Sequence, residues 1–404
     1  MNTRRYDIDA LRVIAFALLI LYHVCMLYVT DWGWHVKSSY QTEALQWPMI
    51  FINRWRMSLL FLISGLAIGL FNPAGAGGRF ALSRTWRLFL PLLFGMFFIV
   101  PVQAYCQGVS NGLVAPGFGA FLLRYWSFQP WPKDAFDGWQ YGITWNHLWY
   151  LAYLWVYTLL LCVLLPALES PLGKRMQAAV CGLRGAGLII LPALPLVLYL
   201  TTLARLFPAT NDLLHDWFQH ALYFSVLLYG YVMARSTALW HELGRLRYVA
   251  TALAVLLFAV YIVWDLQLGE HPFDLTVAGI RSIRGFYMWT ALLAILGWGH
   301  VLLNRPFRWL PYATEAVLAW YVLHQSLIVL VAYWLIPLHL GPVLEPLLVI
   351  VATFGGCALL HEFVIRRTTL LRPLFGLKSL SPRRQFAAPA ASVIALASTA
   401  DDVR

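Results

Sequence analysis

Charged residues are scarce in this 404-residue chain. Asp, Glu, Lys and Arg make up 12% of the sequence, whereas apolar residues make up 61%. A soluble domain carries roughly twice that charged fraction, so the composition excludes an ordinary soluble protein and indicates an integral membrane protein. The net charge of +11 comes from basic residues scattered through the loops rather than gathered in one patch. This scatter argues against a nucleic-acid partner and favours a lipid bilayer around the chain.

Cysteines and the signatures of soluble enzymes are also few. The five cysteines show no metal-ligand spacing, and most of them fall inside apolar runs, where we expect them to pack as small apolar side chains. The sequence has no Gly-rich phosphate loop, no His-Glu-x-x-His and no Gly-x-Ser-x-Gly. It shows no internal repeat, which weakens a transporter hypothesis built on inverted halves. We therefore expect no bound metal or cofactor.

Apolar stretches long enough to cross a bilayer recur along the chain and predict an all-α polytopic membrane protein of about ten transmembrane helices. The predicted spans are residues 10–30, 52–71, 88–107, 146–167, 187–206, 216–234, 248–265, 284–303, 312–335 and 343–364. Ten crossings would put both termini on the same side of the membrane.

The basic residues predict which side that is. With a cytoplasmic N-terminus, the inner segments hold 21 of the 29 Lys and Arg residues, and such a bias marks the cytoplasmic side. We expect both termini to be cytoplasmic, with a membrane domain over residues 1–375. Residues 376–404 are rich in Pro, Ser and Ala and are predicted to form a disordered cytoplasmic tail.

Two ionisable residues lie on the first apolar helix. Arg12 and His23 are eleven positions apart, which is a rise of about 16 Å and slightly over three turns, so both side chains point the same way. Ionisable groups at membrane depth are costly unless they are paired or line a wet cavity, and they mark functional sites by default. The alternative is an Arg12 that reaches toward the surface and a histidine that only packs.

The ninth predicted helix carries a second set of polar residues. His324 lies about as deep as His23, on a rise of about 1.5 Å per residue, and Glu315 matches the depth of Arg12. We therefore expect an ion pair between Arg12 and Glu315. Glu315 and His324 face opposite sides of a straight helix, whereas Tyr321, His324 and Gln325 share one face.

Three further clusters have both a plain and a functional interpretation. Ser64-Gly65 in the second helix is either a small-residue packing face or a hydrogen-bonding site. Arg84 and Arg87 are either topology determinants or, one turn apart, a binding site for a polyphosphate. His147 begins the fourth helix near the outer surface.

Two outer segments, residues 31–50 and 108–145, are rich in aromatic residues. They are interpreted either as an interfacial aromatic belt or as a surface on which sugar rings stack. Belts are general in membrane proteins, so the belt is the favoured interpretation.

Taken in order, these motifs resemble the acyltransferase 3 family of membrane-bound acyltransferases. The resemblance covers about residues 5–375 and rests on Asp9-Ala10-Leu11-Arg12, the Arg12-x10-His23 spacing, Phe61-Leu62-Ile63-Ser64-Gly65, Arg84-x-x-Arg87 and Tyr321-Val322-Leu323-His324-Gln325. The segment from His147 to Leu151 is similar to the branch that succinylates periplasmic glucans. The acidic segment that the O-acetylating branch has near this point is missing here.

The resemblance implies an enzyme of the bacterial inner membrane that moves an acyl group, succinyl or acetyl, from cytoplasmic acyl-CoA to a hydroxyl of an extracytoplasmic glycan or related acceptor. Arg84 and Arg87, with Arg12, would face the phosphates of the donor. A reaction of this kind needs a base with a pKa near neutrality, which histidine supplies.

We expect His23 to be the general base or a transient acyl carrier. His324 would orient the acceptor or stabilise charge on the thioester oxygen. The remaining candidate binding residues are Ser64, His147, Glu315, Tyr321 and Gln325, with His147 contacting the acceptor rather than the donor. The main alternative is a proton-coupled transporter or lipid-intermediate flippase, which would also bury Arg, His and Glu residues.

Overall fold

The structure is a computed structural model that describes residues 4–71, 73, 75, 77–267 and 274–379, without the side chains of 265–267, 274 and 275. Within these residues the fold is helical, and its β pairing is limited to one isolated bridge between Val29 and Thr42. The prediction of an all-α polytopic membrane protein is confirmed.

The helices run in chain order as follows. They are α1 (Tyr6–Cys25), α2 (Gln46–Phe71), α3 (Gly77–Phe94), the π-helical turn η2 (Gly95–Ile99), α4 (Pro101–Ser110), α5 (Phe118–Tyr125), the 3₁₀ turn η4 (Asn146–Leu148), α6 (Trp149–Glu169), α7 (Pro171–Cys181), α8 (Gly185–Ile190), α9 (Ala193–Thr201), α10 (Leu203–Leu206), α11 (Trp217–Met233), α12 (Thr237–Gln267), α13 (Asp274–Leu303), α14 (Leu310–Leu335), α15 (Leu344–Leu359), the π-helical turn η6 (Leu360–Ile365) and α16 (Leu371–Leu374). The short 3₁₀ turns Glu43–Leu45, Trp139–Tyr141 and Ile336–Leu338 lie in the connections.

In the described part of the chain, nine helical segments are long and apolar enough to cross a membrane. The remaining predicted span, residues 216–234, corresponds to α11, whose 17 residues are at the lower end of the length that spans a bilayer. Three predicted spans start about ten residues too late, because the third begins at Gly77, the seventh at Thr237 and the eighth is part of a helix that begins at Asp274. The charged residues Arg84, Arg247 and Arg281 were placed outside these spans, although they lie within helices.

Helices α2 and α11 run side by side in the same direction, and glycines set their distance. A Cβ built on Gly65 would lie 1.9 Å from the carbonyl oxygen of Leu227, and one on Gly230 would lie 2.1 Å from that of Leu62. Small residues of this kind let helix backbones approach closely in membranes. Ser64-Gly65 is therefore a packing face at Gly65, and its neighbour Ser64 remains free to point elsewhere.

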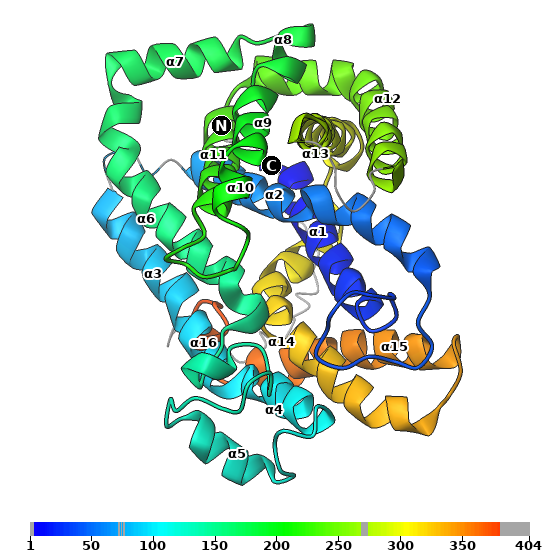
Figure 1. Ribbon diagram of the computed structural model, residues 1–404. Helices are drawn as coiled ribbons and strands as arrows, with labels where there is room; N and C mark the ends of the chain where they lie inside the picture. Colours follow the sequence, from blue (N-terminus) through cyan, green and yellow to red (C-terminus); the bar gives the residue numbers. More distant parts are fainter. Residues whose placement is uncertain (1–3, 72, 74, 76, 268–273, 380–404) are drawn as a thin grey trace, which may run out of the picture.

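Helix α1 lies in the middle of the molecule, packed against α2, α13 and α14 (Figure 1). The other main pairs are α3 with α6, α12 with α13 and α14 with α15. This central place surrounds the polar residues of α1 with protein rather than lipid. Asp7, for example, is fully buried and pairs with Arg5 and His300.

The two aromatic-rich outer segments fold onto the helices. Residues 26–45 return over the end of α1, with Ser38 and Thr42 bonded to the backbone of that turn. In residues 108–145, an aromatic core forms around α5. Trp131 in this core is 6% exposed. For these side chains the belt interpretation is wrong, because they pack on one another instead of facing the interface.

The C-terminal part of the predicted tail, residues 380–404, lies outside the described residues. The first residues of the segment are still attached to the bundle. Leu377 is buried, and the Nε of Arg372 donates a hydrogen bond to the carbonyl oxygen of Lys378 at 2.7 Å.

Candidate active site

His23 and His324 meet in the interior. Nδ1 of His23 lies 2.9 Å from Nε2 of His324, and the two ring planes are within 6° of each other. His324 is fully buried on α14, and His23 sits within the last turn of α1. The equal depth predicted from the sequence thus corresponds to direct contact.

The backbone around His324 fixes the protons of both rings. Nδ1 of His324 lies 2.7 Å from the carbonyl oxygen of Tyr321 and 3.2 Å from that of Trp320. Carbonyl oxygens only accept hydrogen bonds, so Nδ1 of His324 carries the proton and its Nε2 is an acceptor. His23 must then donate through Nδ1, which leaves the lone pair of its Nε2 available. Nε2 of His23 makes no hydrogen bond to any described residue.

His147 belongs to the same cluster. It lies in η4, is 6% exposed, and its ring meets that of His324 edge-on at 5.0 Å between centroids. Its Nε2 donates to the carbonyl oxygens of Tyr321 and Val322, and Tyr321 returns a hydrogen bond from its hydroxyl to the carbonyl of His147. His147 lies at the start of the span that begins at Asn146, and its side chain is buried against α14 rather than exposed at the surface.

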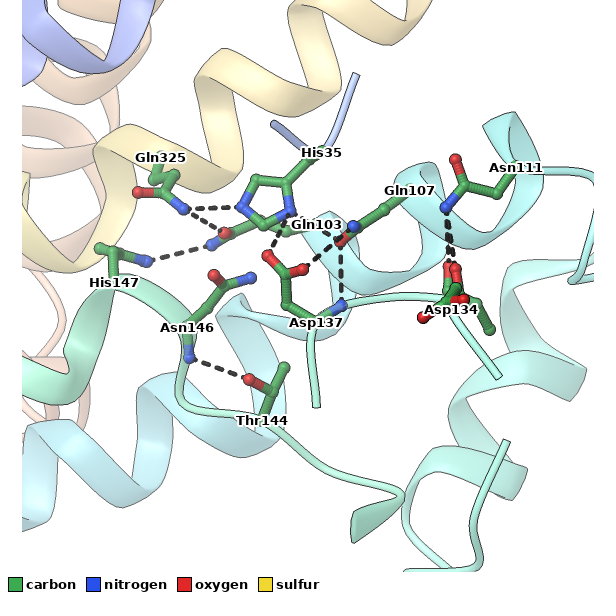
Figure 2. A network of polar contacts seen from close by, with 11 residues as sticks. His35, Gln103, Gln107, Asn111, Asp134, Asp137, Thr144, Asn146, His147 and Gln325 are labelled. Carbon is green, nitrogen blue, oxygen red and sulfur yellow. Dashed lines mark hydrogen bonds and ion pairs between the residues drawn. The ribbon is translucent and has the colours of Figure 1, made fainter. Parts of the chain in front are cut away.

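A hydrogen-bonded network joins this cluster to the outer segment (Figure 2). Gln325 donates to Nε2 of His35 at 2.9 Å and to Oε1 of Gln103 at 3.0 Å. His35 in turn donates through Nδ1 to Oε1 of Gln107 at 2.7 Å, with a carboxylate oxygen of Asp137 at 3.4 Å. Gln103 completes the path with a 3.3 Å contact from its Nε2 to Nδ1 of His147.

This network holds the residues 108–145 over the histidines. A single assignment of donors and acceptors satisfies every contact among these amides and imidazoles, so the network fixes the positions of their side chains. The spacing predicted that Gln325 shares a face with Tyr321 and His324, whereas His35, Gln103 and Gln107 were not predicted to belong to the site. The spacing of Gln103 and Gln107, four residues apart inside an apolar span, was the available signal, since polar groups there need partners.

A cavity of 210 Å³ brings together several residues of the predicted site. Its polar lining includes Arg12, Ser64, Arg84 and Arg87, all of which were predicted, together with Tyr150, Thr158 and Thr314. The hydroxyls of Ser64 and Tyr150 are 2.8 Å apart. Phe16 also lines the cavity and packs edge-on against Tyr321 at 5.4 Å, next to His324. The rings of Phe16 and Tyr321 thus lie between the cavity and the histidine pair.

The predicted ion pair between Arg12 and Glu315 is wrong. Arg12 pairs with Asp9, three residues earlier on α1, at 3.1 Å. Glu315 instead accepts from Nε of Arg366 at 3.2 Å, at the end of the α15 segment. Equal depth was a poor guide because it says nothing about direction around the helix axis. Glu315 therefore lies outside the cavity lining, on the α15 side of α14.

The loop after α1 covers His23. The ring of Trp34 packs on that of His23 at 5.4 Å and an angle of 28°. Lys37 holds the loop in shape by donating to the carbonyl oxygens of Met26 and Val29. Burial lowers the pKa of Lys37. Among the described residues, no group of three or more His, Cys, Asp or Glu side chains is arranged to hold a metal ion.

Two histidines in contact near an arginine-lined cavity, inside a polytopic helical bundle, are the arrangement expected of a membrane-embedded group-transfer enzyme. Residues 5–362 match the model of the acyltransferase 3 family, described as an acyltransferase domain, and the chain belongs to this family. It is an O-acyltransferase.

Two curated proteins are similar to the chain along nearly its whole length. They are glucans biosynthesis protein C of Escherichia coli O6:K15:H31 (strain 536 / UPEC) and of Escherichia coli O81 (strain ED1a). Each is 23% identical over 405 residues, which covers 96% of this chain and 98% of the relative. No solved structure matches the chain significantly.

Proposed function

We propose that this enzyme transfers an acyl group from cytoplasmic acyl-CoA to a hydroxyl of an extracytoplasmic glycan or related acceptor, in the bacterial inner membrane. The observation that carries the proposal is the histidine pair. His324 is locked by a backbone carbonyl and accepts from His23, so His23 presents an unprotonated Nε2. An oriented neutral imidazole is what general-base chemistry on a hydroxyl requires.

The cavity is the proposed donor site. Arg84 and Arg87 lie one turn apart on α3, and neither forms an ion pair with a described carboxylate. Arginines without such partners suit the diphosphate and 3′-phosphate of coenzyme A, which guanidinium groups bind in bidentate fashion. The pantetheine arm would run past Phe16 and Tyr150 to bring the thioester to His23.

In the proposed transfer, Nε2 of His23 takes the proton of the acceptor hydroxyl while the hydroxyl oxygen attacks the thioester carbonyl carbon. The carbon–sulfur bond breaks, and the coenzyme A thiolate leaves and receives that proton. The charge that forms on His23 is stabilised through Nδ1, which donates to His324. Both ring nitrogens of His324 are engaged in this arrangement, so we assign it the positioning of His23 rather than a bond to the thioester oxygen.

A transient acyl carrier would use the same atom of His23. In that sequence Nε2 attacks the thioester first and passes the acyl group to the acceptor hydroxyl second. A glycan acceptor and an outward direction of transfer are supported by the names of the two similar proteins and by the excess of Lys and Arg on the side of the cavity.

The test is release of free coenzyme A by purified protein supplied with acetyl-CoA or succinyl-CoA and a glucan oligosaccharide. We expect turnover by the wild type, none by His23→Ala, and a sharp loss in Arg84→Ala. Full activity of a well-folded His23→Ala variant would refute the assigned base. No release from either donor would refute the transfer reaction and favour the transporter alternative.

A further inference from the structure

A second group of arginines lies on α2 and α13, outside the lining of the cavity. It consists of Arg54 and Arg56 on α2 and Arg281 and Arg284 on α13, and we call it the outer arginine cluster. Arg56 lies eight residues before Ser64 of the cavity, which is about 12 Å along the helix axis. The two basic groups therefore occupy different depths.

The outer arginine cluster reaches the active site through Tyr22. The guanidinium of Arg56 lies 3.5 Å from the centre of the Tyr22 ring, and that ring is 6.0 Å from the ring of His23. Asn53 holds Tyr22 in place by donating to its hydroxyl at 2.8 Å. One aromatic ring thus separates a fixed positive charge from the candidate base.

The cluster is short of acceptors. Nε and Nη1 of Arg56, Nε of Arg54 and Nη1 of Arg281 are buried, and none of these nitrogens has a hydrogen-bond partner. No carboxylate among the described side chains forms an ion pair with any of the four arginines. Arg284 is close enough to Arg54 and Arg281 for their charges to interact, and Tyr223 lies near both Arg284 and Arg56. The bond from Arg54 to the Tyr261 hydroxyl supplies no negative charge.

Like charges gathered without a counter-ion are unfavourable unless a ligand brings the missing charge. Guanidinium groups present forked pairs of N–H donors that fit the two oxygens of a carboxylate or phosphate. We propose that the outer arginine cluster is an anion subsite, which binds a carboxylate or phosphate group carried by a substrate whose reacting atom lies at His23. This inference rests on the proposed acyl transfer.

Two sources would bring such a group. One is a terminal carboxylate on the transferred acyl chain, and the other is an acidic substituent on the acceptor. The cluster would then select charged substrates over uncharged ones of similar size. Succinyl-CoA and butyryl-CoA form a matched donor pair, and a glucan oligosaccharide with and without a phosphate substituent forms a matched acceptor pair.

The experiment measures kcat/KM for both pairs with wild type, Arg56→Gln and Arg284→Gln. We expect the charged-to-uncharged ratio for one pair to fall about 10- to 100-fold in both variants, the range for losing a charged hydrogen bond. A fall in the donor ratio assigns the acyl carboxylate, and a fall in the acceptor ratio assigns the acceptor anion. Arg124→Gln is the control, since Arg124 is exposed and packs on Trp131 far along the outer segment. Ratios equal to the wild type in both variants would overturn the proposal.

A binding measurement separates this proposal from the reaction itself. We expect succinate or inorganic phosphate to raise the unfolding temperature of the wild type and of Arg124→Gln, and to have no effect on Arg56→Gln or Arg284→Gln. If the wild type releases no coenzyme A but shows this pattern, the transfer reaction fails and the anion subsite stands. If neither anion stabilises the wild type, the anion subsite fails.

Discussion

Both ring nitrogens of His324 are engaged in hydrogen bonds, so we expect this residue to act on the reaction through His23. We expect His324→Ala to lower kcat about 100-fold or more with little change in the KM for acyl-CoA. His324→Gln should restore part of the activity, since an amide oxygen also accepts the bond from Nδ1 of His23. The measurement is coenzyme A release. His215→Ala, on an exposed outer loop, is the control, and equal losses in the Ala and Gln variants would contradict a positioning role.

The proposed binding of the donor phosphates by Arg84 and Arg87 can be tested with a truncated substrate. If they bind the phosphates, Arg84→Gln should raise the KM for acyl-CoA about tenfold or more, the usual cost of a charged hydrogen bond. The same variant should lose much less with an acyl-pantetheine thioester, which has no phosphate group. Equal losses on both thioesters would show that Arg84 supports the fold of the cavity instead of the donor.

At the scale of single residues, only part of the candidate site could be predicted from the sequence. Counting residues along each helix predicted that His23 and His324 lie at the same depth, because rise per residue is fixed, and the structure adds that the two rings are in contact. The same counting failed for Arg12 and Glu315, because a shared depth leaves the direction around the helix axis open. Arg56 lay inside the second predicted span, residues 52–71, but was not predicted to belong to a site.

At the scale of elements, the contact between α2 and α11 is the closest backbone approach that bears on the site. Gly65→Ala would place its Cβ against the Leu227 carbonyl, and overpacking of this kind costs about 1–3 kcal/mol. We expect a lower unfolding temperature in detergent and lower activity, because Ser64 next to it would shift away from Tyr150. Gly355→Ala on α15 is the matched control, since a Cβ there meets nothing within 4 Å. Equal stability of the two variants would contradict the tight contact.

The elements also divide into those that a sequence predicts and those that it does not. Apolar runs predicted the spans because length and hydropathy decide them. The outer segments have no such period, so their aromatic core and the network through His35, Gln107 and Asp137 were not predictable from it. That network depends on contacts between residues far apart in the chain, such as His35 and Gln325.

For the whole molecule, contacts between helix ends determine how the chain alternates across the membrane. Asp7 at the start of α1 pairs with His300 at the end of α13, and Glu315 near the start of α14 pairs with Arg366 after α15. In each pair, the start of an odd-numbered membrane span lies beside the end of an even-numbered one: the first span beside the eighth, and the ninth beside the tenth. This alternation requires α11 to cross as well, although it is the shortest of the predicted spans.

Cysteine accessibility tests this topology at α11. In a variant without the native cysteines, we expect His215→Cys to react with a membrane-impermeant maleimide added outside intact cells. Arg235→Cys should react only after the membrane is permeabilised. The two positions flank α11, and Arg235 is exposed while the His215 side chain is 75% exposed, so access depends on the side of the membrane. Lys133→Cys and Lys174→Cys serve as outer and inner references. Labelling of both test positions from the same side would mean that α11 does not cross. The chain would then make an odd number of crossings, which would contradict the pairs of Asp7 with His300 and of Glu315 with Arg366.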